Sequence, residues 1–405
     1  MDGVDVDVVL VALVGLVTLA ASAIRELALR TRVPALVGFL ALGVALRALD
    51  GATGLVTPPV ASGLRLLADL GIVALLFDVG LRSNPAALAR RLPAASLVWA
   101  GNVGLSGLLG FLACRVLLDL ALVPSLVAAT ALTATSVGVS VSAWREAGAL
   151  DTPDGELLVD VAELDDLSAV ALVGLLFAVA PVLGDGEAAL LGAVTGAAGS
   201  FVLRLLLLAA GAALFARHAE RHVTEWAARL PSAPQRMLVV LGVGLLIAAL
   251  AGGLGFSLAI GAMLAGLLFS RDPEAVRTEE ALQGLATFAT PFFFVVTGMG
   301  VELEAVPHAL AAGAVLLGAA VLGKVVGTAV PALAVTSRQG ALLLGLSMVP
   351  RAEIATVVLD QARHALPGQV GPELYAAMVA VVAATCVLSP LALGRLLPAT
   401  DAAPG

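Results

Sequence analysis

Long apolar runs separated by short polar links make up almost the whole chain. Most runs have about 18 residues or more, the length that a helix needs to cross roughly 30 Å of hydrocarbon. We therefore predict an all-α membrane protein with about thirteen transmembrane helices. The predicted spans cover residues 6–24, 34–49, 64–81, 94–118, 121–142, 156–183, 188–215, 236–252, 255–270, 287–301, 308–332, 340–361 and 371–396.

The composition agrees with this pattern, since 60% of the residues are hydrophobic and 13% are charged. A soluble domain is about half apolar and a quarter charged. We expect one polytopic domain over residues 1–405, with no cytoplasmic regulatory domain. The acidic N-terminus does not resemble the basic start of a signal peptide, so the first helix should be retained.

The sequence lacks the patterns that mark several other protein classes. Cys114 and Cys386 lie inside apolar runs, and no cysteine or histidine spacing is typical of a metal site. We see no cofactor motif and no nucleophile–base arrangement, and therefore expect no cofactor and no enzymatic activity. Basic runs with aromatic residues are also absent, which argues against nucleic-acid binding.

The arginines indicate the orientation of the chain, because positive charge is retained on the cytoplasmic side. They gather in the links that follow odd-numbered spans, and Arg363 is the clear exception. This alternation places the N-terminus outside and the C-terminus in the cytoplasm of a cell (plasma or inner) membrane.

An inverted repeat is plausible, with halves at 6–183 and 236–396 and a linker helix at 188–215. The fifth and twelfth spans are equivalent in the two halves, and each is interrupted, at Thr133–Gly138 and at Ser347–Arg351. Such interruptions indicate a transport site near the middle of the membrane. A structural kink is the alternative explanation.

The adjacent carboxylates Asp165 and Asp166 are the strongest chemical signal. They lie eight or nine residues into the sixth span, roughly 12–14 Å from its cytoplasmic end at 1.5 Å per residue. A charge at that depth costs about 2.5–3.5 kcal/mol and normally marks an ion or proton pathway. Two neighbouring carboxylates cannot easily both be ionised, so protons and a cation such as Na⁺ should compete for them. Interhelical hydrogen bonding is the alternative role.

Lys324, in the eleventh span, is the single lysine beside 21 arginines. A buried lysine can lose its proton, whereas an arginine effectively cannot. We expect Lys324 to pair with one aspartate and to release a proton when sodium binds. A static salt bridge or chance placement is the alternative.

Other polar residues of the interrupted spans could support this site. The unwound backbone from Thr133, with the hydroxyls of Thr135 and Ser136, could offer oxygen ligands to Na⁺. Arg351 and Glu353 are expected to stabilise the interrupted helix through ion pairs.

Glu163 could line the cytoplasmic approach to the site. Asp160 and Asp78 are further acids near or within the predicted spans, and Asp160 could be merely solvated. Their roles stay open at the level of the sequence.

At these residues the chain resembles the bacterial sodium–proton exchangers of the cation:proton antiporter superfamily, second branch. The similar segments are ATALTATSVGVS, VDVAELDDLSAV, PFFFVVTGMGVEL, LGKVVGT and SMVPRAEIATVV. The resemblance implies thirteen helices in a core and a dimer domain, two crossing helices and a homodimer. It implies that Asp166 carries the cation and proton, that Asp165 pairs with Lys324, and that exchange is electrogenic with two protons per sodium.

The sequence departs from the usual pattern of that family at four positions. Asp78 and Arg82 replace an uncharged residue and a glutamate, Ala352 replaces a glycine, and Glu163 is an additional acid. These differences leave the ion selectivity open, with Li⁺ as a further substrate. The runner-up is an electroneutral K⁺/H⁺ or broad monovalent cation/H⁺ antiporter. A channel and a sodium-coupled organic anion transporter are less favoured.

Overall fold

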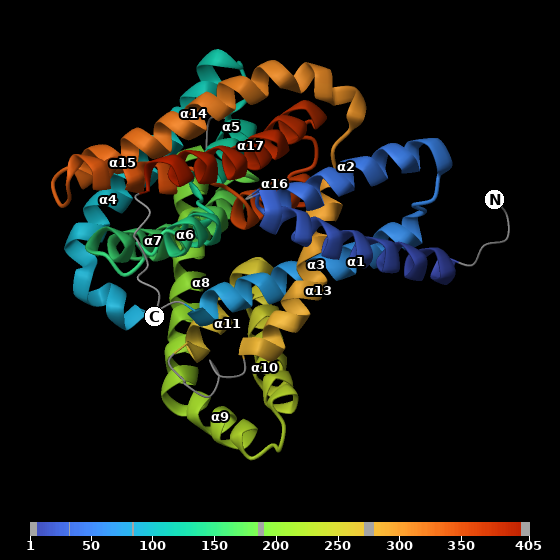
Figure 1. The fold of residues 1–405 in the computed structure, drawn as a ribbon, viewed down its shortest axis with the longest axis horizontal. Helices are drawn as coiled ribbons and strands as arrows, with labels where there is room; N and C mark the ends of the chain where they lie inside the picture. The colour runs from blue at the N-terminus through green and yellow to red at the C-terminus, as the bar shows by residue number, and fades with distance from the viewer. Residues whose placement is uncertain (1–5, 32, 83–84, 185–189, 271–278, 398–405) are drawn as a thin grey trace. The chain divides into compact units, whose positions relative to one another are not determined.

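The computed structural model describes residues 6–31, 33–82, 85–184, 190–270 and 279–397, and all regular secondary structure in these ranges is helical (Figure 1). The helices are α1 Val6–Thr31, α2 Ala35–Thr53, α3 Pro58–Arg82, α4 Pro85–Leu112, α5 Leu122–Thr133, α6 Val137–Glu146, α7 Pro153–Val179, α8 Leu190–His218, α9 Glu220–Ala228, α10 Ala233–Gly253, α11 Leu258–Phe269, α13 Glu279–Met299, α14 Val306–Ala332, α15 Arg338–Ser347, α16 Glu353–Ala365 and α17 Pro372–Leu396.

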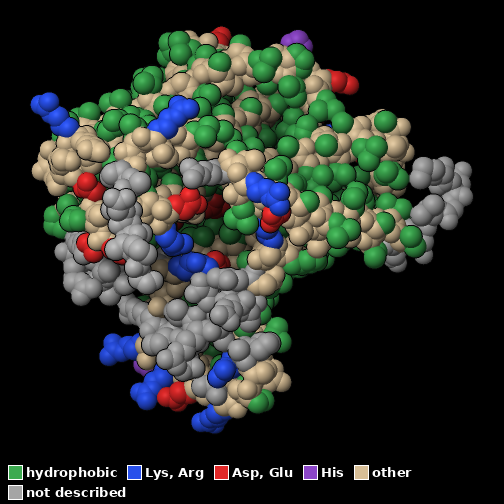
Figure 2. Space-filling view, viewed as in Figure 1, with side chains coloured by type: hydrophobic (Ala, Val, Ile, Leu, Met, Phe, Trp, Pro, Cys, Tyr) green, Lys and Arg blue, Asp and Glu red, His purple; other side chains and the backbone are tan. Residues whose placement is uncertain are grey.

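The all-α prediction is confirmed, and each predicted span overlaps one helix or a pair of half-helices. Nine helical segments of the described chain are long and apolar enough to cross a membrane by length and composition. The acid-rich α7, the shorter helices α11, α15 and α16, and the shorter apolar segment Gly284–Met299 of α13 are not among them. The total of thirteen spans therefore stays a prediction. Figure 2 shows hydrophobic side chains over much of the visible face, as expected for a surface in lipid.

Two segments differ from the prediction in detail. The short helix α9 follows α8 in the link between the seventh and eighth predicted spans, where no element was predicted. It is amphipathic, with Thr224 and Ala227 buried and Trp226 exposed. Of the further link 271–286, the structure describes only the part from Glu279, which begins α13; the rest lies outside the described residues.

The chain divides into two compact units. Unit 1 comprises Met1–Ala23, Leu49–Pro85 and Leu191–Val296, and unit 2 comprises Ile24–Ala48, Ala86–Leu190 and Thr297–Gly405. The predicted halves follow the order of the sequence, whereas each unit is assembled from separate stretches of the chain.

Close packing of α3 against α11 organises unit 1. A Cβ added to Gly80 would meet the backbone of Met263, and one added to Gly266 would meet the backbone of Phe77. Small residues allow such backbone contact between membrane helices, where lipid offers little hydrophobic driving force for association. Beside this contact the rings of Phe77 and Phe269 lie 6.4 Å apart, centre to centre.

Unit 2 contains both interrupted helices, α5–α6 and α15–α16, which lie among α7, α14 and α17 (Figure 1). Close approaches of small residues also bring α4 against α14: Gly101 meets Gly327, and Gly323 meets Ser106. These contacts matter because Asn102 and Lys324 are the next residues along their helices, and both reach the site described below.

Candidate cation and proton site

The two helix interruptions leave backbone groups without partners inside their own helices. The α5 helix ends at Thr133, and Ala134 and Ser136 are extended before α6 begins. The α15 helix ends at Ser347, and Ala352 has an irregular backbone conformation before α16. Helix ends expose unpaired N–H and C=O groups, which are costly at membrane depth unless other groups bind them.

The two interruptions bind each other. The backbone N–H of Ser136 donates to the carbonyl of Pro350 at 2.8 Å, and the Thr135 hydroxyl donates to the carbonyl of Met348 at 3.3 Å. The hydroxyl of Ser140 donates to the carbonyl of Ser347. The unwound segments are therefore held by direct contacts between the α5–α6 and α15–α16 interruptions.

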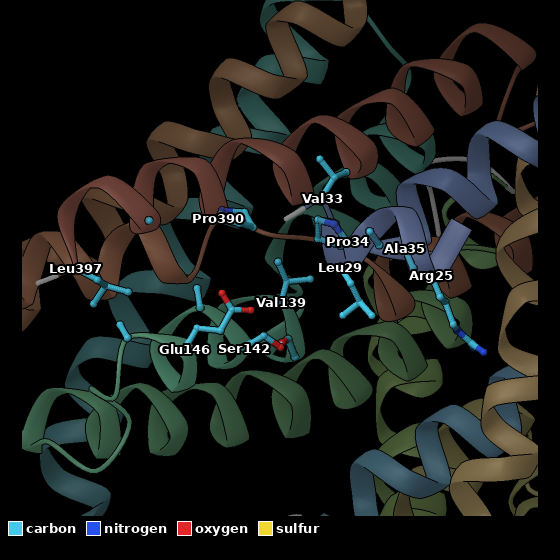
Figure 3. A pocket seen from close by; sticks show the side chains of 15 residues that line it. Arg25, Leu29, Val33, Pro34, Ala35, Val139, Ser142, Glu146, Pro390 and Leu397 are labelled. Carbon is cyan, nitrogen blue, oxygen red and sulfur yellow. The ribbon is translucent and has the colours of Figure 1, made fainter. Parts of the chain in front are cut away.

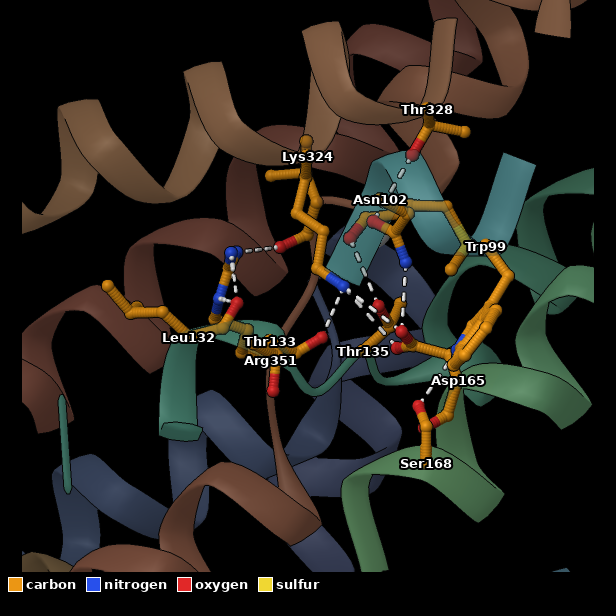
Figure 4. Close-up of polar contacts among 12 residues, drawn as sticks. Trp99, Asn102, Leu132, Thr133, Thr135, Asp165, Ser168, Lys324, Thr328 and Arg351 are labelled. Atoms are coloured by element: carbon orange, nitrogen blue, oxygen red, sulfur yellow. Dashed lines mark hydrogen bonds and ion pairs between the residues drawn. The ribbon is translucent and has the colours of Figure 1, made fainter. Parts of the chain in front are cut away.

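Two buried cations bind the carbonyl end of α5. Arg351 donates to the Leu132 carbonyl from Nη2 at 2.8 Å and to the Ala320 carbonyl at 3.1 Å. Lys324 Nζ donates to the carbonyl of Thr133 (Figure 4). The C-terminus of a helix carries partial negative charge, so cations are stabilised there.

Lys324 also forms a buried ion pair with Asp165. Its Nζ lies 3.3 Å from Oδ2, and the two side chains are 0% and 1% exposed. The amide of Asn102 donates to Asp165 Oδ1 at 2.9 Å, and the hydroxyl of Thr328 donates to the Asn102 carbonyl at 3.2 Å. Because Thr328 occupies the carbonyl of Asn102, the amide N–H₂ is turned toward the carboxylate (Figure 4).

The start and middle of α7 fix where these carboxylates lie. Thr152 caps the helix by accepting from the Gly155 N–H at 3.2 Å, and Pro153 occupies the first turn. Further along, the Ser168 hydroxyl donates a hydrogen bond to the backbone carbonyl of Asp165 at 2.9 Å. Trp99 Nε1 donates to the same hydroxyl at 2.9 Å. Helix α7 is thereby tied to α4 beside Asp165.

Asp166 has a different environment although it is the next residue. It is partly exposed, and among the described residues no hydrogen bond reaches its carboxylate. The charges that act on it come from Glu353, Asp165, Lys324 and Glu163. One aspartate is thus bound on several sides, while its neighbour is available to a ligand.

The structure brings most of the predicted site residues together, with two differences in their contacts. Arg351 binds carbonyls, and Glu353 accepts a hydrogen bond from Ser136 at 3.0 Å, so their support comes from these contacts instead of the expected ion pairs. The Thr133 hydroxyl donates a hydrogen bond to the Thr130 carbonyl, and the Thr135 hydroxyl donates one to the Met348 carbonyl. Thr133 therefore contacts Lys324 through its backbone carbonyl and not through its hydroxyl.

The remaining acids are placed as follows. Glu163 is partly buried on α7 and acts electrostatically on Asp166, whereas Asp160 is buried. Asp78 lies on α3 in unit 1, with its carboxylate 3.0 Å from Arg82.

Sequence reasoning missed Asn102, Thr328 and Ser140. The signal that could have found Asn102 is an amide inside a long apolar run, where polar side chains usually bind another helix. Thr328 and Ser140 gave no such signal, because hydroxyl residues are common in membrane helices and often bond to their own backbone.

A buried lysine–aspartate pair and a second, partly exposed carboxylate thus lie where the two interrupted helices meet. Residues 14–398 match the family described as sodium/hydrogen exchanger, transmembrane. The chain therefore belongs to this family of multi-pass cation/proton antiporters.

Curated relatives include both sodium and potassium antiporters. The chain is 26% identical over 334 residues to the high-affinity Na⁺/H⁺ antiporter NhaS3 of Synechocystis. The alignment covers 80% of this chain and 69% of that protein. It is 25% identical to the Na⁺/H⁺ antiporter of Enterococcus hirae, and that alignment covers 90% of this chain and 92% of the relative. It is 28% identical to the putative K⁺ efflux antiporter KefB of Alkalimonas amylolytica over 71% of this chain, but spans 42% of that relative's length.

The fold is similar to a solved structure. The sodium proton antiporter MjNhaP1 of Methanocaldococcus jannaschii aligns over 97% of this chain and 99% of its own, with a TM-score of 0.69 and 16% identity. At this identity the likeness concerns the fold.

Proposed function

We propose that the protein exchanges Na⁺ for H⁺ across the cell membrane by alternating access, with Asp166 as the shared cation and proton carrier. The observation that carries the proposal is the contrast between the two aspartates. Asp165 is held by Lys324 and Asn102, whereas Asp166 is partly exposed and faces further acids. A carboxylate in such a place can hold a proton or a hard cation, but not both.

Lys324 is the proposed second proton carrier. It is the chain's single lysine, and its ammonium group is buried between the Asp165 carboxylate and the Thr133 carbonyl. A cation arriving beside it is repelled by its charge, and loss of the lysine proton removes that repulsion. Two protons then leave for one sodium that enters, and one net charge crosses the membrane in each cycle. A potential of 100 mV contributes about 2.3 kcal/mol per net charge.

The proposal includes the predicted setting in the membrane. We infer an extracellular N-terminus and a cytoplasmic C-terminus, inverted halves at 6–183 and 236–396 with a linker helix at 188–215, and a homodimer in the plasma or inner membrane. Li⁺ is proposed as a further substrate, since it is a similarly hard monovalent ion. The arginine distribution supports the orientation.

Reconstituted liposomes test the function. Proton movement is recorded on addition of Na⁺, Li⁺ or K⁺, with the membrane potential free or clamped, for the wild type and Asp166→Asn. A Na⁺ response that depends on potential and disappears in the variant supports electrogenic exchange at this residue. Absence of any cation-driven proton movement in the wild type would reject the proposal.

A K⁺/H⁺ antiporter, electroneutral or broad in its selectivity, is the second candidate. It is favoured by the potassium efflux antiporters among the relatives, at 26–28% identity. In the same experiment this candidate predicts a K⁺ response that is insensitive to the clamped potential.

A further inference from the structure

Helix α13 belongs to both compact units of the chain. Its residues up to Val296 are part of unit 1, and Thr297 begins the last stretch of unit 2. Among the described helices, α1 and α2 also contain a unit boundary in their interior. Of these three, only α13 has a proline inside the helix, Pro291. It therefore has a weak point close to the boundary between the units.

Close backbone contacts hold α13 on both sides of this proline. Before it, a Cβ added to Gly71 of α3 would meet the backbone of Ala289, and both residues belong to unit 1. After it, a Cβ added to Gly298 would meet the carbonyl of Leu40 on α2, and both residues belong to unit 2. Tightly packed backbone cannot give way as a flexible side chain can, so each unit holds its own part of α13.

Hydrogen bonds strengthen the attachment of the end of α13 within unit 2. The Tyr375 hydroxyl of α17 donates to the Thr297 carbonyl at 3.0 Å, and Arg363 Nη1 of α16 donates to the Gly300 carbonyl at 2.8 Å. The Arg363 guanidinium also lies over the Tyr375 ring, 4.5 Å from its centre. A cation is stabilised at the C-terminus of a helix. These contacts give a role to Arg363, the exception in the arginine pattern.

Pro291 lies between the two attachments. It has no backbone N–H, so it cannot donate to the carbonyl one turn earlier, and its ring crowds that carbonyl. The helix nevertheless continues through Pro291 to Met299. Because one hydrogen bond of the helix is missing here, bending α13 at this turn costs less than bending it at a turn that is fully bonded.

We propose that α13 is a hinge of the transport cycle, which bends in the turn around Pro291 while its two attachments stay intact. The inference rests on the proposed alternating access, since that mechanism requires one part of the protein to move against another. It does not depend on which cation is transported. Pro291 belongs to unit 1, yet as a hinge it acts on the rate of exchange.

Two substitutions at the same position test the hinge. Pro291→Ala restores the backbone N–H and stiffens the helix, whereas Pro291→Gly restores it but keeps the turn flexible. In reconstituted liposomes, Pro291→Ala should lower the maximal rate of Na⁺-driven proton movement about ten-fold, which corresponds to about 1.4 kcal/mol on the barrier. The Na⁺ concentration at half-maximal rate should not change. Pro291→Gly should exchange at close to the wild-type rate, although it should melt at a lower temperature than Pro291→Ala.

Pro390 provides the matched control, because it also lies inside a helix, α17, and that helix belongs to unit 2 alone. It borders a cavity of about 830 Å³, so loss of its ring on that side requires no repacking (Figure 3). Pro390→Ala should exchange at the wild-type rate. The proposal is overturned if Pro291→Ala exchanges as fast as the wild type, or if Pro291→Gly exchanges no faster than Pro291→Ala.

Hydrogen–deuterium exchange tests the bend independently of transport. In the purified full-length protein, the amides of residues 292–296 should exchange about ten-fold faster in the wild type than in Pro291→Ala. If the wild type shows no cation-driven proton movement, the proposed function fails, and this measurement alone decides whether α13 bends at Pro291. Equal amide exchange in the two proteins would contradict the hinge even where transport is intact.

Discussion

The helices inside unit 1 and the helices inside unit 2 pack through different kinds of contact. In unit 1 the contact of α3 with α11 rests on glycines that meet backbone, Gly80 and Gly266, and on the aromatic pair of Phe77 and Phe269. Its ion pairs Arg82–Asp78 and Arg221–Glu225 have cationic side chains that are 48% and 85% exposed. In unit 2 the charged side chains of Lys324 and Arg351 are buried and bind backbone carbonyls at the helix interruption.

This difference teaches where polar groups are tolerated at membrane depth. A buried charge is stable only where several partners share it, and interrupted helices supply such partners as free carbonyls and amides. The glycine contacts of unit 2 support this arrangement, because the approach of α4 to α14 brings Asn102 to Thr328, which holds the amide that binds Asp165. We therefore expect substitutions at these polar contacts of unit 2 to affect transport and those in unit 1, apart from the hinge around Pro291, to affect stability.

The largest expected effect is that of Asp166→Asn, which should reduce exchange to the level of empty liposomes while the protein stays folded. The amide cannot carry a proton or the negative charge that a cation needs. Proton flux in liposomes, together with a melting temperature in detergent, measures both outcomes. Asp78→Asn is the matched control in unit 1, where loss of a partly exposed pair should change activity by no more than about two-fold. Equal losses in the two variants would contradict the comparison.

Lys324→Ala should give the next largest effect, because it leaves the Asp165 carboxylate buried without its cation. Breaking a buried ion pair on one side typically costs about 3–5 kcal/mol, and we expect a clear fall in melting temperature. Lys324→Arg keeps the charge but removes the titratable proton. Its folded protein should exchange one proton fewer per sodium, measured as loss of the dependence on potential. Unchanged coupling in Lys324→Arg would show that the lysine is purely structural.

Asn102→Ala should follow, since it removes a hydrogen bond to a charged group worth about 1.5–3 kcal/mol. The expected result is roughly ten-fold weaker exchange, with a smaller loss of stability than in Lys324→Ala. Thr328→Val provides a graded control, because it frees the Asn102 amide to rotate without removing it. We expect that variant to lie between Asn102→Ala and the wild type in a sodium titration. If Thr328→Val reduced exchange more than Asn102→Ala does, Thr328 could not act only by orienting the Asn102 amide toward Asp165.

Gly266→Ala in unit 1 should have the smallest effect on transport. The added methyl group would meet the Phe77 backbone, and overpacking of this kind costs about 1–3 kcal/mol of stability. Exchange per folded molecule should stay at the wild-type rate. Gly242→Ala makes the same change where the added carbon meets nothing, and it should retain the wild-type melting temperature or raise it slightly. If both variants melt alike, close packing of α3 and α11 is not what stabilises unit 1.

The sequence predicts the helices well and the contacts between them poorly. The length of each apolar run determines whether it can cross a membrane, so every predicted span overlaps a helix of the structure. The cost of burying charge likewise singled out Asp165, Asp166 and Lys324. Neither rule says which residues of two distant spans face each other. The contact of Arg351 with Leu132 and the role of Asn102 therefore emerge only from the fold.

The mutual binding of the two interrupted helices has a consequence for biosynthesis. The carbonyl of Leu132 is bound by Arg351, a residue that follows it by 219 positions. At about 5–20 residues per second, the ribosome needs roughly 10–45 s to supply that partner. During this interval the backbone groups at the end of α5 need other hydrogen-bond partners, such as water, lipid headgroups or the insertion machinery. The first half of the chain thus enters the membrane before this partner exists, and the contacts at the helix crossing form only after Arg351 has been synthesised.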